Sequence, residues 1–254
     1  MDGKIKEIEN AFQQTTKLIF GEAINDFYRY EEWLARWIPS GAVLKSATNG
    51  KEIYLPDYSA MKFIPHERVA DEASIEELSK RKIEISDAES IDSISKKLSE
   101  KTLFVCDVSM GTNVNVHKSC IYLNLSNAYR TVDCFNSKNI ACSFWSDRCD
   151  YSFGVCKSFN CNFCINCNNS RDLTRCLEVD FSKNCSDVMF CHNCDNVRES
   201  LFCFNTKNKR YAIANVEVGK DKYIEIKKKL IEYIINELKT KQTLDIDIYN
   251  IGCR

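Results

Sequence analysis

Residues 158–193 read SFNCNFCINCNN, SRDLTRCLEVDF and SKNCSDVMFCHN when they are written in blocks of twelve. The blocks extend over residues 122–217, with a polar third position, most often Asn, and an eighth position that is almost always large and apolar. The third position carries Asn124, Asn136, Arg148, Asn160, Asp172, Asn184, Asn196 and Asn208; the eighth carries Tyr129, Ala141, Phe153, Ile165, Leu177, Met189, Leu201 and Ile213. A repeat this short cannot close a core of its own, so successive repeats must stack.

Cysteine is the unusual component of the chain. There are 15, of which 12 lie between Cys134 and Cys203. Ten of these 12 occupy block positions one, four, seven or ten, the exceptions being Cys142 and Cys156. Columns of small, compact residues suit the interior of a narrow coil stacked at ~4.8 Å. Asn in columns suits corners, because Asn tolerates the left-handed conformation and its amide can bond the same amide one coil away. The repeat therefore predicts a mainly β fold, a parallel β-solenoid.

Two coil lengths fit the blocks. A coil of twelve residues places Cys149 over Cys161, Cys164 over Cys176 and Cys191 over Cys203; a coil of 24 places Cys161 over Cys185 and Cys167 over Cys191. We expect the apolar eighth position to face inward, where its bulk is too great for a twelve-residue tube, so the coil of 24 is favoured. A compact multi-zinc domain is the alternative to any solenoid.

The flanking segments predict three regions: a helical N-terminal region over 1–102 with a short hairpin and a connecting arm, the solenoid over 103–217, and a capping helix with a C-terminal strand over 218–254. In the first region, apolar spacing predicts helices over 4–19 and 22–38, and Asn49-Gly50 predicts a hairpin turn. Ser74 and Glu77 resemble a capping box for a helix over 75–82, and Ser86 or Asp87 would begin another over about 88–100. The segment 102–108 reads as a strand.

At the C-terminal side, apolar residues from Tyr223 to Leu238 line one face of a helix that we expect to cover the last open coil. Residues 244–252 alternate as an edge strand would. The tryptophans of the second helix, Trp33 and Trp37, predict packing against a neighbouring element; a partner-binding face is the alternative, and would make these helices the contact with an assembly.

The net charge and the N-terminal sequence bear on where the protein is located and what it binds. The net charge is −1, so no global field attracts the protein to nucleic acid or anionic lipid. The charged N-terminus has no apolar signal region, and no apolar run reaches the ~18–20 residues that cross a bilayer. The cluster Lys207, Lys209, Arg210 and Tyr211 is interpreted as the solvated rim of the last coil, so the sequence carries no clear nucleic-acid signature. These features predict a protein without a signal peptide or a membrane span, located in the cytoplasm or in a virion.

A metal site is the first chemical alternative. Cys161, Cys164 and Cys167, together with Cys191 and Cys194, have the spacing of thiolate ligands for zinc or an iron–sulfur cluster, and Cys185 would join them. The repeat already explains this spacing, because the same columns hold cysteines outside any C-x-x-C context. We therefore expect no cofactor, with zinc as the alternative.

Catalysis is the second alternative. Nucleophilic catalysis needs a Cys or Ser beside a His, and the chain has only His66, His117 and His192. His192 is interpreted as a surface or corner residue; His117 beside Asp107 or Cys120 stays open. A β-helix enzyme acting on carbohydrate needs converging carboxylates, but the carboxylates of the repeats fall in many different columns. We expect no catalytic residue and no enzyme activity.

Residues Cys185 to about Tyr233 carry a resemblance. The features are Phe202-Cys203-Phe204-Asn205, then the alternation Lys209-x-Tyr211-x-Ile213-x-Asn215, then a helix that opens near Tyr223. This segment resembles uncharacterised Cys-rich β-solenoid proteins of archaea, uncultured bacteria and their viruses. The resemblance implies a repetitive thiol-rich domain with a helical cap, and it implies no activity.

Together these observations predict a non-enzymatic structural or interaction protein, a subunit of a larger assembly such as a virion. Its expected partners are proteins or further copies of the chain in a homo-oligomer. The alternatives are a zinc or iron–sulfur module and a β-helix carbohydrate-active enzyme.

Overall fold

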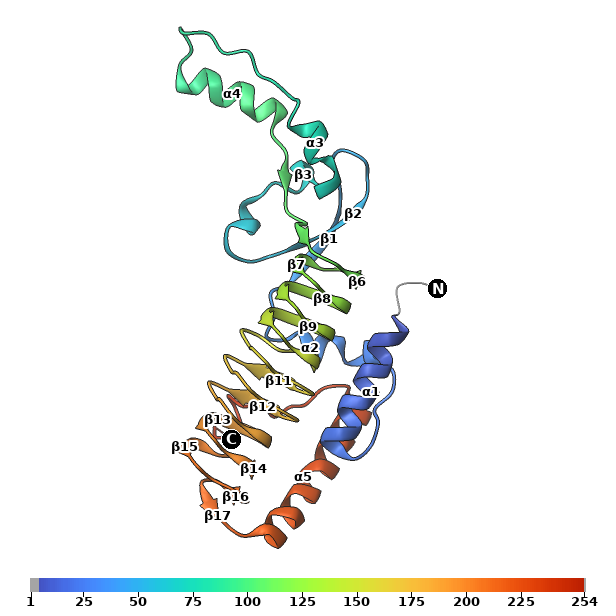
Figure 1. Ribbon diagram of the computed structural model, residues 1–254, viewed down its shortest axis with the longest axis vertical. Helices are drawn as coiled ribbons and strands as arrows, with labels where there is room; N and C mark the ends of the chain where they lie inside the picture. Colours follow the sequence, from blue (N-terminus) through green and yellow to red (C-terminus); the bar gives the residue numbers. More distant parts are fainter. Residues whose placement is uncertain (1–4, 254) are drawn as a thin grey trace.

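The computed structural model describes residues 5–253 and shows a rod of stacked coils with helices along one flank (Figure 1). One sheet of 13 strands runs through the coils, and its ladder is parallel except for the antiparallel pair β16–β17 at its end. The predicted mainly β fold, a parallel solenoid of about nine turns, is confirmed. Its strands are β5 (Ser109–Met110), β6 (Val114–His117), β7 (Cys120–Leu123), β8 (Ser126–Phe135), β9 (Lys138–Asp147), β10 (Asp150–Phe153), β11 (Ile165–Asn168), β12 (Leu177–Asp180), β13 (Ser186–Asp195), β14 (Arg198–Leu201), β15 (Phe204–Lys207), β16 (Ala212–Ile213) and β17 (Val216–Glu217).

Each coil has twelve residues. Ala128 pairs with Ile140, and Ile165 pairs with Leu177, as Cα partners twelve positions apart. The expected coil of 24 is therefore wrong. The contacts between thiols are those that the shorter coil predicts, such as Cys149 with Cys161.

The corners of the coil follow a shorter rule than the twelve-residue block. From Asn115 to Ala214 every third residue has a positive φ, between 45° and 56° except at Gly154, where φ is 70°. The coil thus turns at block positions three, six, nine and twelve and has four short sides. The Asn column at position three is one of these corners, as predicted. Neighbouring members are joined by hydrogen bonds between side-chain amides, such as Asn124 Nδ2 to Asn136 Oδ1 (3.1 Å). These hydrogen bonds offset the cost of the left-handed backbone conformation.

The interior is lined by block positions one, four, seven and ten, the columns in which the cysteines were predicted. The buried apolar members of these columns form one continuous cluster from Leu125 to Ala212. Position eight does not belong to it. Phe153, Ile165 and Leu177 instead point out of the coil into a second cluster, which they share with the helices. Bulk at position eight therefore places no limit on the width of the tube, which is why the argument for 24 residues fails.

Ser and Cys suit the interior for a reason beyond size. The amide of Cys149 donates to Ser137 Oγ (2.9 Å) and the amide of Cys194 donates to Ser182 Oγ (3.0 Å), one coil earlier in each case. The same side chains donate to the carbonyl two residues before them, as Ser182 does to Asp180 (2.9 Å). Inward amides and carbonyls thus find partners in the side chains, because a small hydroxyl or thiol can both accept and donate.

The N-terminal helices pack on the outward face of position eight. They are α1 (Lys6–Phe20), the 3-10 helix η1 (Phe27–Tyr30) and α2 (Glu31–Ala35). Phe12 lies edge-on to Phe153 (5.2 Å between centroids). The predicted start of the first helix at residue 4 lies outside the described residues, and the single helix predicted over 22–38 is wrong, because residues 21–26 are irregular and only five residues form α2. Trp33 is 2% exposed within this core, so its expected packing is confirmed and the alternative of an assembly contact is wrong for Trp33.

Residues 41–105 form a small module at the first coils (Figure 1). The predicted hairpin is confirmed as β1 (Gly41–Lys45) and β2 (Glu52–Pro56). It is followed by η2 (Ser59–Phe63), η3 (His66–Arg68), β3 (Val69–Ala70), η4 (Glu72–Ser74), α3 (Ile75–Leu78), α4 (Ile91–Lys101) and β4 (Phe104–Val105). The predicted capping box is wrong: α3 is four residues long and Ser74 makes no cap bond, since its hydroxyl donates to Asp71. Ser90, rather than Ser86 or Asp87, caps α4.

The C-terminal helix α5 (Lys220–Lys241) begins beside the last coil and runs back along the flank that carries α1 (Figure 1). Tyr223, at its first turn, donates to the carbonyl of Asp187 (3.3 Å). The helix thus covers the last coils from the side, and the antiparallel strand β17 ends the ladder. The predicted strand over 244–252 is wrong: the segment forms turns, although its alternation does bury Leu244, Ile246 and Ile248. Within residues 5–253, no helix is long and apolar enough to cross a bilayer.

Candidate functional site

The six cysteines of the predicted metal site lie on the inner walls of the tube, each buried and each with a free thiol: Cys161, Cys164, Cys167, Cys185, Cys191 and Cys194. They occupy four different columns, and across residues 5–253 no group of three or more His, Cys, Asp or Glu side chains is arranged to hold a metal ion. Burial raises the pKa of Cys167 to about 11 and that of Cys185 to about 12. Cys167 and Cys185 are therefore thiols near neutral pH, whereas a hydrogen bond with Cys191 lowers the pKa of Cys194. Several of these thiols also donate to backbone carbonyls of the coil, as Cys194 does to the carbonyl of Cys203 (3.3 Å).

Among the described residues, no histidine ring is hydrogen-bonded to a thiol or a hydroxyl, and the one ring with a recorded partner is that of His192. His192 Nδ1 lies 2.9 Å from Asp180 Oδ2, and its side chain is one-third exposed at the outer surface of a coil. His117 and Asp107 line a common hollow of about 340 Å³ next to the hairpin. Cys120 is fully buried, its thiol donates to the carbonyl of Cys106 (2.7 Å), and burial raises its pKa. That thiol is held in the protonated form and is not an activated nucleophile.

The carboxylates of the repeats are spread around the rod, as their columns predict. Four of them bond a cation about one coil away: Lys138–Asp150 (3.2 Å), Arg175–Asp187 (2.7 Å), Lys183–Asp195 (3.3 Å) and Arg210–Glu199 (2.7 Å). A glycosidase needs two carboxyl groups facing one groove. The outer carboxylates instead serve as links between coils.

One carboxylate is buried where three parts of the chain meet. Glu178 bonds Arg36 of the N-terminal region, accepts from Asn166 Nδ2 (2.9 Å) and accepts from the amide of Ile248 in the C-terminal segment (3.2 Å). Burial raises its pKa to about 7, although Arg36 and the two hydrogen bonds act in the opposite direction. The C-terminal segment covers this carboxyl, so Glu178 fixes the two ends of the chain to the rod.

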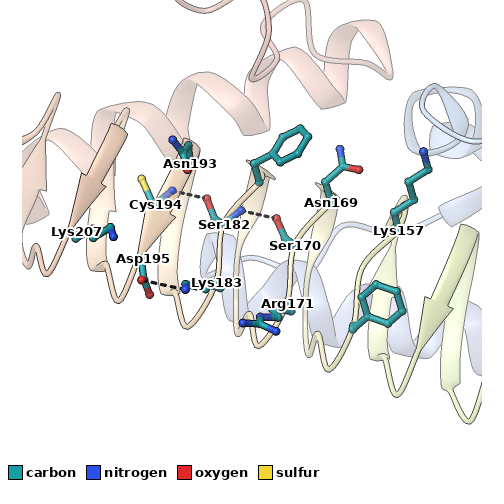
Figure 2. Close-up of a pocket in the computed structure, with 12 residues that line it drawn as sticks. Lys157, Asn169, Ser170, Arg171, Ser182, Lys183, Asn193, Cys194, Asp195 and Lys207 are labelled. Atoms are coloured by element: carbon teal, nitrogen blue, oxygen red, sulfur yellow. Dashed lines mark hydrogen bonds and ion pairs between the residues drawn. The ribbon is translucent and has the colours of Figure 1, made fainter.

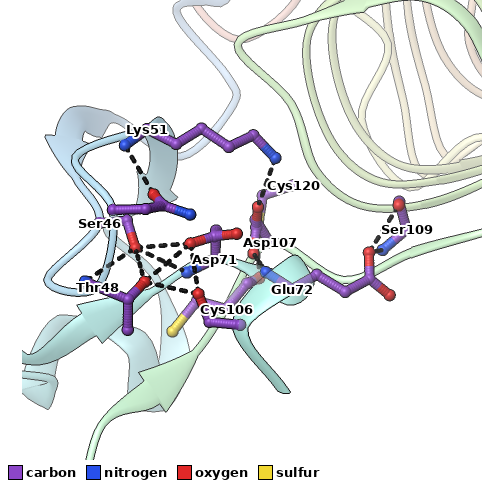
Figure 3. Close-up of polar contacts among 11 residues, drawn as sticks. Ser46, Thr48, Lys51, Asp71, Glu72, Cys106, Asp107, Ser109 and Cys120 are labelled. Atoms are coloured by element: carbon purple, nitrogen blue, oxygen red, sulfur yellow. Dashed lines mark hydrogen bonds and ion pairs between the residues drawn. The ribbon is translucent and has the colours of Figure 1, made fainter. Parts of the chain in front are cut away.

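A second polar cluster joins the hairpin module to the first coil (Figure 3). Asp71 Oδ2 accepts from the hydroxyls of Ser46 (2.7 Å), Ser74 (2.8 Å) and Thr48 (3.1 Å). Burial alone would raise the pKa of Asp71, but these hydrogen bonds hold it at about 2. Glu72 continues the network by accepting from the backbone amide of Ser109 (2.9 Å). The cluster is a structural joint, since Asp71 Oδ2 and Glu72 bond groups of the hairpin module and the first coil, while Asp71 Oδ1 is buried without a hydrogen-bond partner.

The side of the rod opposite the helices carries a group of basic and aromatic residues. Positions one and two form this side, and positions seven and eight, which carry the helices, lie across the tube. Position two runs Phe159, Arg171, Lys183, Asp195 and Lys207, each a β-bridge partner of the next. The neighbouring corner runs Trp145, Lys157, Asn169, Phe181 and Asn193, each in the left-handed conformation. We call these two columns together the basic–aromatic face.

The basic–aromatic face contains a shallow hollow of about 570 Å³. Figure 2 shows Lys157, Asn169 and Asn193 along one edge of it, and Arg171, Lys183, Asp195 and Lys207 along the other. Four cations and one carboxylate therefore line the hollow of a protein whose net charge is −1. Aromatic rings are exposed beside them: Phe181 is 61% exposed, Trp145 51% and Phe159 37%.

The cations of this hollow are largely uncompensated. Lys183 bonds Asp195 (3.3 Å), and Lys157 lies over the ring of Trp145 (5.8 Å). Arg171 and Lys207 have no ion pair within the described chain. This face cannot be recognised in the sequence alone, because its members are about twelve residues apart and form a cluster only when the coil length is known. The signal available was the run of basic and aromatic residues at block positions two and twelve.

The chain matches no protein-family model, and no curated protein matches it either.

Proposed function

We propose that this protein is a non-enzymatic interaction protein, a structural subunit of a larger assembly such as a virion, and that the basic–aromatic face is its binding surface. The observation that carries the proposal is that this face leaves three large rings exposed beside four cations, of which Arg171 and Lys207 have no ion pair within the described chain. Exposed aromatic residues and unpaired cations on a rigid support are typical of binding surfaces.

The rest of the rod supports this assignment. The helices α1, α2 and α5 cover the flank formed by position eight, so the apolar residues of that flank are already buried. The interior is filled by apolar side chains and by Ser and Cys side chains that bond the backbone, and no described histidine ring is hydrogen-bonded to a thiol. Stacked coils that are joined by hydrogen bonds between Asn side chains and by ion pairs make a stiff scaffold. A stiff scaffold suits a protein that presents a binding surface rather than one that closes around a substrate.

Self-association is part of the proposal. Strand β15 pairs with β13 on one side and has no strand on its other side within the described chain, where the side chain of Asn215 bonds the amide and the carbonyl of Phe204. The rest of this edge can accept another strand, as in a homo-oligomer. Sedimentation velocity at rising protein concentration should then show a species larger than the monomer, and a constant monomer mass would remove the homo-oligomer from the proposal.

Binding to an immobilised polyanion tests the face itself. The wild-type protein should be retained on heparin despite its net negative charge, because the four cations act locally. The double variant Arg171→Glu/Lys207→Glu should elute at clearly lower salt. The matched control, Lys220→Glu/Lys222→Glu, makes the same charge change on exposed positions of α5 and should elute close to the wild type. Equal elution of the two variants would show that the face is not the binding surface.

A further inference from the structure

We infer that the occupant of the basic–aromatic face is a single-stranded nucleic acid lying along the axis of the rod. This inference rests on the proposed function and adds the chemical class of the partner.

The first step is the spacing of the charges. Coils repeat at ~4.8 Å, so Arg171 and Lys183 lie roughly 5 Å apart along the axis. Lys207 lies roughly 10 Å beyond Lys183, and the coil between them carries the one carboxylate of the hollow, Asp195, which is the ion-pair partner of Lys183. Lys157 is on the adjacent corner, one coil before Asn169. Charges in this order form a track along the rod, which suits a linear polyanion rather than a single compact anion.

The second step is the position of the rings. The ring-bearing positions Trp145 and Phe181 lie on the same corner three coils apart, and Phe159 lies on the side between them. All three are exposed beside the cations. Single-stranded nucleic acids are held by this combination, a positive track for the phosphates and aromatic rings on which unpaired bases stack.

The third step separates this partner from others. An acidic protein segment or an acidic polysaccharide would neutralise the cations but would offer no flat base to the rings. A duplex offers phosphates, but its bases are stacked on one another and are not free to cover Phe181. Exposed corner amides such as Asn193, whose Nδ2 donates to Asn205 Oδ1 (2.9 Å), supply further polar groups beside the track.

The experiment is fluorescence anisotropy of the full chain with a labelled oligonucleotide of about 12 residues, a length within the range held by single-strand-binding domains. Single-stranded DNA and RNA should bind more tightly than the duplex of the same sequence. With four phosphates neutralised, the slope of log affinity against log salt should be about −3, an approximately 50-fold loss between about 50 and 200 mM salt. Removing two cations, as in Arg171→Ala/Lys207→Ala, should halve that slope.

The rings are tested by substitutions that the repeat tolerates. Phe181→Asn and Trp145→Asn place a residue that favours the left-handed corner, as Asn169 and Asn193 do in the same column. Each should lower the affinity for the single strand about tenfold, since stacking on one ring contributes that much. The control Phe163→Asn removes a ring from a different corner, where it stacks on Tyr151 (4.9 Å), and should leave affinity unchanged.

Two results would overturn the inference. In the first, heparin retains the protein through the face but the single strand does not bind; in the second, the single strand and polyglutamate bind equally and the ring variants have no effect. In both cases the face would remain an anion-binding surface, so the proposed function would stand without this partner. Unfolding midpoints equal to the wild type would confirm that each variant is folded.

Discussion

The interior hydroxyl of Ser182 offers a test of why the tube contains Ser and Cys. Ser182 is 2% exposed, its Oγ accepts the amide of Cys194 (3.0 Å) and donates to the carbonyl of Asp180 (2.9 Å). Ser182→Ala removes one oxygen and leaves a buried donor and a buried acceptor without that partner. Each such group costs about 1–3 kcal/mol, and loss of the buried hydroxyl offsets part of this cost. We expect a net loss of about 2 kcal/mol in the free energy of unfolding.

Ser182→Cys is the matched control, because Cys134 and Cys194 occupy the same column of the coil. A thiol can still accept and donate, so we expect a loss below about 1 kcal/mol, as hydrogen bonds of this kind contribute about 1 kcal/mol in total. Urea unfolding followed by circular dichroism gives the global value. Since coils contact only their neighbours, hydrogen exchange of the Cys194 amide gives the local one, and it should accelerate in the Ala variant alone.

A Ser182→Ala variant with an unchanged or higher free energy of unfolding would refute this explanation. If the columns hold small residues only because space is limited, Ser182→Ala keeps the fit and removes a polar group from the interior. The variant would then be as stable as the wild type, or more stable, and exchange of the Cys194 amide would not change.

Three further predictions concern other parts of the chain. Asn160→Ala should lower the free energy of unfolding by about 1–2 kcal/mol in thermal or urea unfolding, because Asn160 has φ 54° and links two coils through its amide; Asn160→Gly should cost less, and equal losses would contradict the role of the corner. Because the pKa of Asp71 is lowered to about 2 from an ordinary value near 4, its contribution to stability should be complete above about pH 4 and be lost as pH falls toward 2. Asp71→Asn should remove that dependence of the urea midpoint, and an unchanged pH profile would contradict it. In the native protein the exposed Cys253 should react fast with a thiol reagent and the partly buried Cys156 slowly, while all 15 thiols should react after unfolding. Fewer than 15 would indicate disulfides, and stoichiometric zinc in elemental analysis of the native protein would support the metal-binding alternative.

The sequence predicts the solenoid because a repeat imposes one environment on every twelfth residue. Each coil must offer the same corner, inner wall and outer wall to the next, so the Asn column and the Cys columns are visible without coordinates. Local signals also suffice where a turn is decided by its own residues, as at Asn49-Gly50. They fail at 22–38 and 244–252, where the apolar pattern records burial against the rod and not a regular helix or strand.

Tertiary structure decides everything that depends on which way a column points. Position eight reads as an interior position from its bulk, but α1, α2 and α5 cover it from outside, and so the interior can be as narrow as twelve residues allow. The basic–aromatic face is invisible in the chain for the same reason: Phe159, Arg171 and Lys183 are separated by twelve residues each and become neighbours only when the coil closes at that length. A repeat fixes the order of the columns, whereas contact with the helices fixes which columns are left for a partner.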